Sequence, residues 1–426
     1  MQPKKTQHRL PFGSDATIQD LCTKYGTPLF IHDENSYRRQ GRQALDAPNA
    51  YGLTVRYAMK ANPHGMVLRI FDRLGIEFDA SSSHEVKRAL AAGIAPQKIQ
   101  LTSQKMLDRQ ELKEIVEMGV IYNGTSLEQL RLFADLYPGH VGPLSVRINP
   151  GLGSGHNKRT NTAGQGASFG IWHEYLPEVL AMAHRHRLTI SRLHTHVGSG
   201  SDWRIWQKAA QLTLDLARHF PDVERINLGG GFKIERMNPE RSIDLQKAFR
   251  PVKRAFEGFA QSTCRRLGLE IEPGTYLAAN PCILVARIDD IVDTGAGGYR
   301  FLKIDASMTE LLRPMIYGAR HPIRLLDKGE AVSDEYVVVG TCCESGDIFT
   351  PKEGDPEGID TIMLPPAERG DFVAIMGAGA YGSAMSAKNY NSRPICAEVM
   401  ILADGSDRLI TSRQRPEDMW ARELTD

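Results

Sequence analysis

The chain has 426 residues, 41% of them hydrophobic and 24% charged, which is the composition of a folded protein long enough for two domains. A net charge of +1 argues against a nucleic-acid partner, because no excess of basic side chains is available to neutralise phosphates. No apolar run approaches the roughly 20 residues that span a bilayer, so we expect no membrane segment. Six cysteines without a CxxC pair favour reduced thiols, and hence a cytoplasmic location, over a disulfide framework.

The first predicted element is a strand within His8–Asp33, and we assign residues 1–33 to a β domain that is completed later in the chain. From about residue 54 onwards, short β-branched runs alternate with longer amphipathic segments. Eight such units in about 220 residues predict an α/β fold, a TIM-like (β/α)8 barrel over residues 34–280, rather than an open sheet. The predicted strands are Thr54–Ala61, Ile76–Ser81, Lys98–Ser103, Val120–Thr125, Pro143–Pro150, Leu188–Ser199, Arg225–Gly231 and Leu269–Gly274.

Helices are predicted between these strands wherever apolar residues recur at helical spacing. The connection between the fifth and sixth strands is longer than a helix needs, and it carries a polar, glycine-rich loop at residues 151–162. Loops of this length in a barrel are more often functional than decorative. The predicted helices include His64–Leu74, Ser83–Ala92, Asp108–Met118, Leu176–Arg185 and Trp203–Phe220.

After about residue 281 the pattern changes to strands with few helices between them. This change predicts a separate, C-terminal all-β domain, a barrel or sandwich, over residues 281–426. Its predicted strands are Cys282–Val292, Arg300–Ile304, Glu335–Gly340, Asp371–Met376, Ala397–Leu402 and Arg408–Ile410.

Lys60 follows the apolar residues of the first predicted barrel strand, in the sequence YAMKAN (57–62), so we expect its side chain to be buried. A buried lysine is costly to desolvate and therefore needs a partner. Burial also lowers the pKa of an amine, as a Schiff-base lysine requires. A structural ion pair and a Schiff base are therefore both open for Lys60.

Other polar residues also lie at the carboxyl ends of predicted strands, where the active site of a barrel forms. Asp79 has the simpler alternative of capping the next helix, and His194 and His196 share one face of a strand, where they could bind a metal ion. A glycine triplet at a strand–helix junction either binds an anion, through its N–H groups and the helix N-terminus, or only makes a tight turn. With Lys60, the set is typical of a pyridoxal phosphate pocket. Its members are Asp79, His194, His196, Ser199, Gly229, Gly230, Gly231, Glu272 and Gly274.

The sequence GAGAYG (377–382) fits the dinucleotide fingerprint G-x-G-x-x-G. That fingerprint requires a surrounding βαβ unit, whereas this stretch lies among the predicted strands of the C-terminal domain. We therefore do not predict a dinucleotide site.

Four motifs, YAMKAN (57–62), HTHVGS (194–199), GGG (229–231) and EPG (272–274), resemble the fold-type III pyridoxal phosphate-dependent decarboxylases. Within that group the chain is similar to the diaminopimelate decarboxylase family. This second resemblance is carried by NPGLGSGHN (149–157), LLRPMIYG (311–318), CESGDIF (343–349), GAYGSAMS (379–386) and NYNSRP (389–394). It runs from about residue 18 to the C-terminus, and the order and spacing of the motifs make it specific.

The resemblance implies decarboxylation of meso-2,6-diaminopimelate to L-lysine and CO2, through a pyridoxal phosphate aldimine on Lys60 and a quinonoid intermediate. His196 would stack on the cofactor ring, and Glu272 would keep the pyridine nitrogen protonated. Ser199 and the glycine triplet would hold the phosphate. The implied cofactor-binding residues are Lys60, Asp79, His196, Ser199, Gly229, Gly230, Gly231, Glu272, Gly274 and Tyr381.

The resemblance also implies how the substrate is bound. Arg313 and Tyr317 would hold its distal end, and Glu344 would recognise the distal ammonium group. Cys343 would donate a proton to the carbanion after CO2 leaves, and Tyr381 would contact both cofactor and substrate. In this family the Cys–Glu pair enters the neighbouring subunit's pocket, which implies a homodimer with a shared active site.

Two positions need comment. The family usually reads EPGR, but position 275 is Thr275, so an arginine that normally helps hold the substrate carboxylate or the cofactor phosphate is missing. Arg313 remains, and Arg159 in the long loop could compensate. Cys342, beside Cys343, is expected to be a small core residue that faces away, as strand neighbours do. Thr275 leaves open a decarboxylase of ornithine, arginine or D-lysine, and a non-catalytic regulatory homologue is the alternative from a different class.

Overall fold

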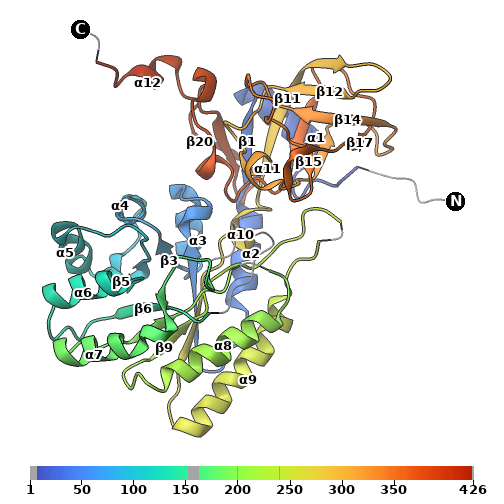
Figure 1. Ribbon diagram of the computed structural model, residues 1–426. Helices are drawn as coiled ribbons and strands as arrows, with labels where there is room; N and C mark the ends of the chain where they lie inside the picture. Colours follow the sequence, from blue (N-terminus) through green and yellow to red (C-terminus); the bar gives the residue numbers. More distant parts are fainter. Residues whose placement is uncertain (1–6, 152–162, 199, 239, 425–426) are drawn as a thin grey trace. The chain divides into compact units, whose positions relative to one another are not determined.

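The computed structural model describes residues 7–151, 163–198, 200–238 and 240–424, and the chain divides into two compact units (Figure 1). The barrel unit comprises Arg38–Ile234 and Arg241–Leu277. The β unit comprises Met1–Tyr37, Glu235–Glu240 and Ala278–Asp426, so three separate stretches of chain build it. The sequence pattern does not anticipate that Glu235–Glu240 belongs to the β unit.

Eight parallel strands of the barrel unit close into a ring, as predicted. Each strand pairs with the next one along the ring, and β10 closes it by pairing with both β9 and β2. Such strands are buried on both faces, which explains why they read as short, continuous apolar runs. The strands of the ring are β2 (Leu53–Ala58), β3 (Glu77–Ala80), β4 (Ile99–Leu101), β5 (Ile121–Gly124), β6 (Leu144–Asn149), β8 (Arg192–His194), β9 (Arg225–Asn227) and β10 (Gly268–Ile271); β7 (Ile171–Trp172) extends β6 outside it.

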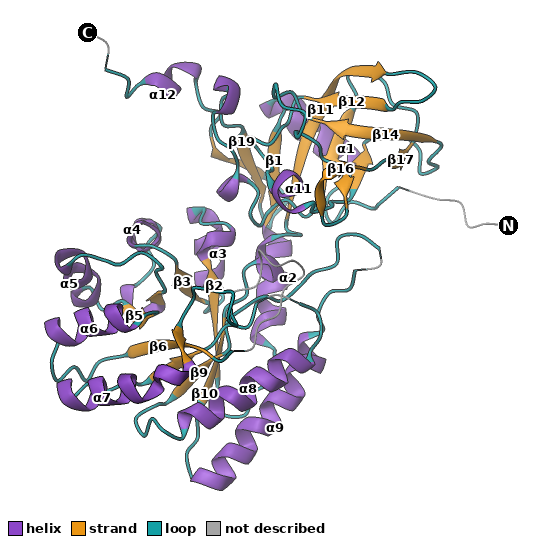
Figure 2. Cartoon of the chain, viewed as in Figure 1, coloured by secondary structure: helices purple, strands orange, loops and turns teal. Residues whose placement is uncertain are grey.

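Helices lie around the outside of this ring (Figure 2). Several begin at a side chain that accepts hydrogen bonds from the first N–H groups of the helix. Ser82 Oγ accepts from the Glu85 N–H at 3.1 Å, while the Glu85 carboxylate accepts from the Ser81 N–H at 2.7 Å. These caps fix where each helix starts after its strand. The helices are α2 (Glu34–Leu45), α3 (Gly65–Arg73), α4 (Ser83–Ala91), α5 (Arg109–Glu117), α6 (Leu127–Leu136), α7 (Leu176–His186), α8 (Arg204–Ala217), α9 (Leu245–Thr263) and α10 (Thr275–Ala278).

A nine-stranded mixed sheet forms the framework of the β unit, with β1 (Leu29–Asp33) inside it. β1 pairs antiparallel with β11 and parallel with β19, which confirms the strand predicted near the N-terminus. Alternate residues of these strands enter two different hydrophobic clusters: Phe30 and Leu284 lie in one, Ile31 and Val285 in the other. The central strands are therefore buried on both faces.

The predicted strands of the C-terminal region are all present, close to their predicted bounds. They are β11 (Cys282–Asp293), β12 (Arg300–Ile304), β14 (Asp334–Val339), β18 (Phe372–Ile375), β19 (Ala397–Ile401) and β20 (Asp407–Thr411). The sequence does not predict the short strands β13 (Ile323–Leu325), β15 (Pro351–Lys352), β16 (Asp355–Ile359) and β17 (Ile362–Leu364). The helices of this unit are α1 (Asp15–Tyr25), α11 (Arg313–Tyr317) and α12 (Pro416–Trp420). Throughout the described part of the chain, no helix is both long and apolar enough to cross a bilayer.

Candidate active site

Lys60 lies just after the carboxyl end of β2, where the strand stops at Ala58 and a short 3-10 turn, Met59–Ala61, follows. The Tyr57 hydroxyl stabilises this turn by donating to the Asn62 carbonyl oxygen at 3.0 Å. The Lys60 side chain is exposed, so its predicted burial is wrong: the apolar run belongs to the strand, and the lysine comes after it. No ion pair to Lys60 is present among the described residues, which removes the structural ion-pair alternative.

Two buried carboxyl groups, Asp79 in β3 and Glu272 directly after β10, converge on one side-chain amide. Gln100 Nε2 donates to Asp79 Oδ1 at 3.2 Å and to Glu272 Oε1 at 3.1 Å. Thr102 Oγ1 donates to Asp79 Oδ1 at 2.6 Å, and Asn227 Nδ2 donates to Glu272 Oε1 at 2.7 Å. Neighbouring strands therefore bring the two acids together inside the barrel.

Both carboxyl groups are harder to ionise than usual. Burial and the charge of Glu272 raise the pKa of Asp79 to about 7. Burial also raises the pKa of Glu272, against the opposing effects of Lys60 and Arg147. Two neighbouring buried carboxyl groups resist ionising together, so a proton on one favours the charged form of the other. The helix-capping alternative for Asp79 is wrong, because α4 is capped by Ser82.

The rings of His194 and His196 are held by different protein groups. His194 Nδ1 lies 2.7 Å from the side-chain nitrogen of Asn123, whereas His196 Nδ1 accepts a hydrogen bond from the Gly230 N–H at 2.9 Å. Burial lowers the pKa of both histidines well below the usual value, so both rings are neutral at pH 7. Among the described residues, no group of three or more His, Cys, Asp and Glu is arranged to hold a metal ion.

The glycine triplet after β9 lets three chain segments approach one another closely. Gly229 has φ +68°, and a Cβ there would lie 2.2 Å from His196 Nδ1. A Cβ on Gly230 would lie 2.1 Å from the carbonyl oxygen of Glu272. Only glycine fits at these two positions without moving the imidazole or the end of β10.

The N–H groups of the triplet are less available to an anion than predicted. The Gly229 N–H donates to Asn227 Oδ1 at 2.8 Å, and the Gly230 N–H donates to His196. No helix begins at the triplet either, because the next one, α9, starts much further along the chain. The predicted strand–helix junction is therefore wrong, and Gly231 is the member of the triplet whose N–H has no recorded protein partner among the described residues.

At Gly274, the loop after β10 packs against the turn that carries Lys60. A Cβ on Gly274 would lie 3.2 Å from that of Ala61, so the two segments are already in contact. Thr275, which replaces the family arginine, is the first residue of α10. Ser199 and Arg159 lie outside the described residues.

In the β unit, Arg313 and Tyr317 lie at the two ends of α11. Arg313 Nε is buried and has no hydrogen-bond partner within the described structure. Burial lowers the pKa of Arg313, while Tyr381 and Tyr317 act in the opposite direction, so both phenols are within electrostatic reach of the guanidinium. Tyr381 has φ +56°, a left-handed conformation that costs a side-chain-bearing residue about 1–2 kcal/mol.

Cys343 and Glu344 are exposed on the β unit, in a turn rather than a strand. The Glu344 N–H donates to the Cys342 carbonyl oxygen at 2.8 Å, and the Cys343 N–H donates to Asn391 Oδ1 at 2.8 Å. Cys342 Sγ lies 3.4 Å from Ser307 Oγ and is half-buried, so it is not the core residue expected. The turn presents the Cys343 thiol to solvent.

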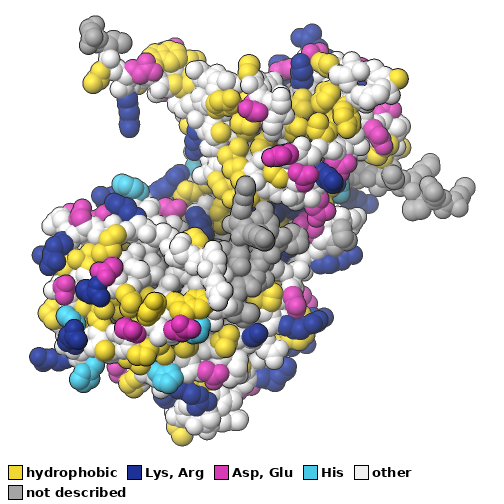
Figure 3. All heavy atoms as spheres, viewed as in Figure 1, with side chains coloured by type: hydrophobic (Ala, Val, Ile, Leu, Met, Phe, Trp, Pro, Cys, Tyr) yellow, Lys and Arg dark blue, Asp and Glu magenta, His cyan; other side chains and the backbone are white. Residues whose placement is uncertain are grey.

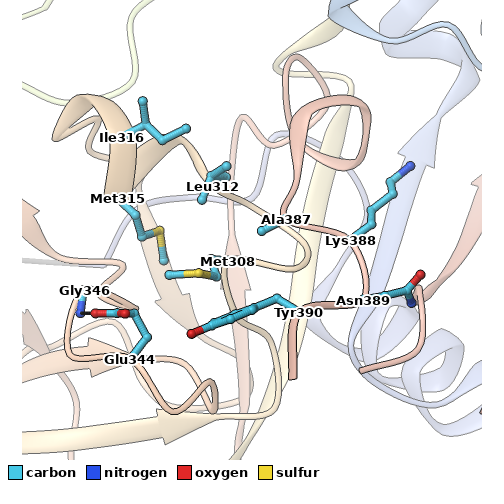
Figure 4. A pocket seen from close by; sticks show the side chains of 10 residues that line it. All are labelled: Met308, Leu312, Met315, Ile316, Glu344, Gly346, Ala387, Lys388, Asn389 and Tyr390. Carbon is cyan, nitrogen blue, oxygen red and sulfur yellow. Dashed lines mark hydrogen bonds between the residues drawn. The ribbon is translucent and has the colours of Figure 1, made fainter. Parts of the chain in front are cut away.

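Glu344 also lines an open pocket of about 650 Å³ in the β unit (Figure 4). Most of the other lining side chains are apolar, and several come from α11 and the loop before it. Hydrophobic side chains gather around α11 on the face shown in Figure 3. The lining residues are Met308, Leu312, Met315, Ile316, Glu344, Gly346, Ala387, Lys388, Asn389 and Tyr390.

Sequence reasoning missed several polar residues of the barrel site. Four of them lie on strands and Thr102 directly follows β4, two residues after Gln100. Polar residues at alternate positions near the end of a predicted barrel strand are the signal that could have found them. The missed residues are Gln100, Thr102, Asn123, Arg147 and Asn227.

A family model described as "Pyridoxal-dependent decarboxylase, pyridoxal binding domain" matches residues 37–279, which include the ring of strands and its polar end. The chain belongs to the pyridoxal-dependent decarboxylases.

The similarity to individual proteins is more specific and spans both units. The chain is 35% identical over 427 residues to a diaminopimelate decarboxylase of Streptomyces coelicolor, covering 98% of this chain and 94% of the relative. It is 33% identical to the Escherichia coli K12 diaminopimelate decarboxylase, covering 96% and 98%. A solved diaminopimelate decarboxylase structure aligns with TM-score 0.88 at 33% identity, over 98% and 99% of the two chains. The Helicobacter pylori enzyme complexed with L-lysine aligns with TM-score 0.84 at 27% identity, over 95% and 99%. Within its class, this chain is a member of the diaminopimelate decarboxylase family.

Proposed function

We propose that this chain decarboxylates meso-2,6-diaminopimelate to L-lysine and CO2, with pyridoxal phosphate as its cofactor. Membership of the diaminopimelate decarboxylase family supports the activity. The observation that carries the proposal is the convergence of Lys60, a neutral His196 and the Asp79–Glu272 pair at the carboxyl ends of the barrel strands. We assign the cofactor to the domain at residues 34–280.

The residues at this end of the barrel fit pyridoxal phosphate. The exposed Lys60 amine can react with an aldehyde, and the neutral His196 ring offers a flat face for a pyridine ring. Glu272 is a buried carboxyl group whose pKa is raised by burial, and a protonated pyridine nitrogen would stabilise its charge. The cofactor supplies a cationic, conjugated ring that takes up the electron pair left on Cα when CO2 departs. Gly231 and Gly274 are the glycines that we assign to the rim of the site.

Cys343 provides the proton that must reach the substrate after CO2 leaves. A thiol suits this step, because thiols as a class ionise near the pH at which enzymes work. The Cys343 thiol is exposed on its own β unit, and the Asn391 side chain holds the backbone of its turn. Asp79 assists by sharing a proton with Glu272, which holds the carboxylate in place within the Gln100 hydrogen-bond network.

The β unit provides the groups that recognise the distal end of the substrate. The Arg313 guanidinium, whose Nε is buried, binds the second carboxylate, and Tyr317 and Tyr381 lie within electrostatic reach of it. Glu344 accepts hydrogen bonds from the distal ammonium group. Arg313 and Tyr317 favour diaminopimelate, because a monocarboxylic amino acid has no second carboxylate for them to bind.

We further propose a homodimer in which Cys343 and Glu344 act in the partner subunit's active site. Both side chains are exposed, and Glu344 lines an open, largely apolar pocket that a second copy could cover (Figure 4). The six cysteines are all free thiols, in keeping with the cytoplasmic location that we expect.

Decarboxylation of ornithine, arginine or D-lysine is the second candidate, and Thr275 is the observation that favours it. Without an arginine at that position, one of the positive charges expected for the distal carboxylate is missing. A non-catalytic regulator is less well supported, because Lys60 and Cys343 are both present.

The test is to measure CO2 release from meso-diaminopimelate with pyridoxal phosphate, beside L-ornithine, L-arginine and D-lysine. We expect turnover of meso-diaminopimelate, with L-lysine as the product. Lys60→Ala should lose both activity and the visible absorption of the lysine-bound cofactor, while Lys105→Ala, at an exposed side chain, should keep both. Preference for a monocarboxylic substrate would reject diaminopimelate, and an unchanged Lys60→Ala spectrum would reject the role of Lys60.

A further inference from the structure

Arg236 is a half-buried cation of the β unit and has no part in the proposed function. It lies in Glu235–Glu240, the short inner stretch that joins this unit. Its Nε and Nη2 atoms are buried and have no hydrogen-bond partner within the described structure. The side chain packs against Gly377, which has φ +65° and where a Cβ would lie 3.2 Å from Arg236 Nε. Unpaired guanidinium N–H groups in such a place are costly unless an acceptor joins them.

A second guanidinium, that of Arg313, lies within electrostatic reach of the first. Burial and the charge of Arg313 lower the pKa of Arg236 to about 9, so Arg236 remains protonated at neutral pH. Arg313 Nε is likewise buried without a partner. His321 is near both arginines, whose charges add to burial in lowering its pKa, and its Nδ1 lies 2.8 Å from the Met376 carbonyl oxygen. Arg236, Arg313 and His321 therefore form a cluster of two cations and a neutral imidazole.

The Glu240 carboxylate acts electrostatically on both arginines and opposes the lowering of their pKa values. Its Oε2 accepts hydrogen bonds from the backbone N–H groups of Arg236 at 2.9 Å and Met237 at 3.1 Å. It does not satisfy the Arg236 Nε and Nη2 atoms, which have no hydrogen-bond partner among the residues that the structure describes. One carboxylate thus lies near two guanidinium groups, and the cluster can accept a further anion.

We propose that Arg236 binds the distal carboxylate of the substrate together with Arg313, and so supplies the positive charge that Thr275 has lost. Two fixed guanidinium groups suit a carboxylate, because each offers parallel N–H donors to its two oxygens. This inference rests on the proposed function, and it identifies the residue that makes this chain selective for a dicarboxylic substrate.

The experiment compares ligands that differ only in the distal carboxylate. L-lysine retains that carboxylate after the reaction, whereas cadaverine lacks it. In the holoenzyme, Arg236→Gln should raise the KM for meso-diaminopimelate and the Kd for L-lysine roughly 10- to 100-fold, since charge-assisted hydrogen bonds are lost. The kcat should change much less, and the Kd for cadaverine, measured by calorimetry, should stay within about twofold.

Controls separate this role from a structural one. Arg408→Gln removes an exposed arginine of the same unit and should leave the KM, the kcat and both Kd values unchanged. If Arg236→Gln does not fold, Arg236→Lys is measured with the same two ligands. It should raise the Kd for L-lysine and leave the Kd for cadaverine unchanged. Equal losses for L-lysine and cadaverine, or no loss for either, would overturn the inference. A wild-type enzyme that neither decarboxylates meso-diaminopimelate nor binds L-lysine would reject the proposed function instead.

Discussion

At the scale of single residues, two adjacent thiols differ in what they can reach. Cys343 is exposed, whereas Cys342 is half-buried beside Ser307. Cys343→Ala should bind the cofactor with an unchanged spectrum but lose about 10²- to 10⁴-fold in kcat, the usual contribution of a positioned acid. Cys342→Ala is the matched control and should retain nearly all turnover. Near wild-type kcat in Cys343→Ala would mean that another group delivers the proton.

The buried acid pair gives the protein a pH dependence that can be measured without substrate. The pKa of Asp79 is raised from 3.8 to about 7, so folding favours its protonated form. The stability that the protonated Asp79 carboxyl group contributes is fully present below about pH 4, and it is lost as the pH rises towards 7. Asp79→Asn should therefore stabilise the cofactor-free protein at pH 8, by on the order of 1–4 kcal/mol, and give no gain near pH 4.

Chemical denaturation at both pH values checks this prediction. Asp135→Asn, at an exposed position of α6, should show no such difference between them. An equal gain for Asp79→Asn at pH 4 and pH 8 would show that titration is not its cause.

Individual residues also mark where sequence reasoning fails. The positions of Lys60, Asp79 and Glu272 at strand ends follow from the sequence, because a barrel collects such residues at one edge. The exposure of Lys60 does not, since it depends on the strand stopping two residues earlier, at Ala58. The partners of the Gly229 and Gly230 N–H groups depend on contacts between neighbouring segments, which a single sequence does not reveal.

At the scale of elements, strand β10 carries a second buried carboxylate one layer below the site. Glu270 accepts two hydrogen bonds from Arg56, at 3.2 and 3.3 Å, and lies 3.6 Å from Arg192 and 3.9 Å from Arg225. Burial acts to raise the pKa of Glu270, but Arg56 and Arg192 outweigh it and the net pKa is lowered. The Glu270 carboxylate therefore stabilises the folded protein at pH values above the ordinary carboxyl range. This stabilisation is lost as the pH falls through the lowered pKa of Glu270.

Glu270→Gln should cost about 3–5 kcal/mol of unfolding free energy at pH 7, because it leaves buried guanidinium groups without a counter-charge. The deficit should shrink as the pH falls below the ordinary carboxyl range and through the lowered pKa of Glu270, where the wild-type carboxylate takes up a proton. Glu257→Gln, in an exposed pair with Lys253 on α9, should cost less than about 0.5 kcal/mol. A Glu270→Gln protein as stable as wild type would mean that the arginines reach solvent or another anion.

Helices and strands can be predicted from the sequence where their pattern of apolar and polar residues is long or strongly alternating. The barrel strands and the helices after Ser82 and Asp108 follow from apolar runs bounded by capping residues. Very short strands cannot be predicted in this way, because two to five residues carry too little periodicity. These strands are β13, β15, β16 and β17. β13 and β17 pair with strands distant in the sequence, β18 and β14, whereas β15 and β16 pair with each other.

At the scale of the whole molecule, the proposed dimer predicts that two inactive variants can restore activity together. Lys60→Ala and Cys343→Ala each damage a different half of a site shared between subunits. After subunit exchange in equal amounts, half of the dimers are hybrids with one intact site, so about a quarter of wild-type activity should return. The unmixed variants are the controls. No recovery, despite hybrids detected by mass spectrometry, would mean that each subunit uses its own cysteine.

The pairing of β1 has a consequence for how the protein is made. β1 (Leu29–Asp33) leaves the ribosome long before its parallel partner β19 (Ala397–Ile401) is synthesised. At about 5–20 residues per second, a ribosome needs on the order of a minute to supply the missing partner. During that time β1 exposes unpaired backbone groups and an apolar face, the features that recruit chaperones or invite aggregation. A stop codon just before β19 would therefore leave the barrel and β11 encoded in full but deprive β1 of its parallel neighbour.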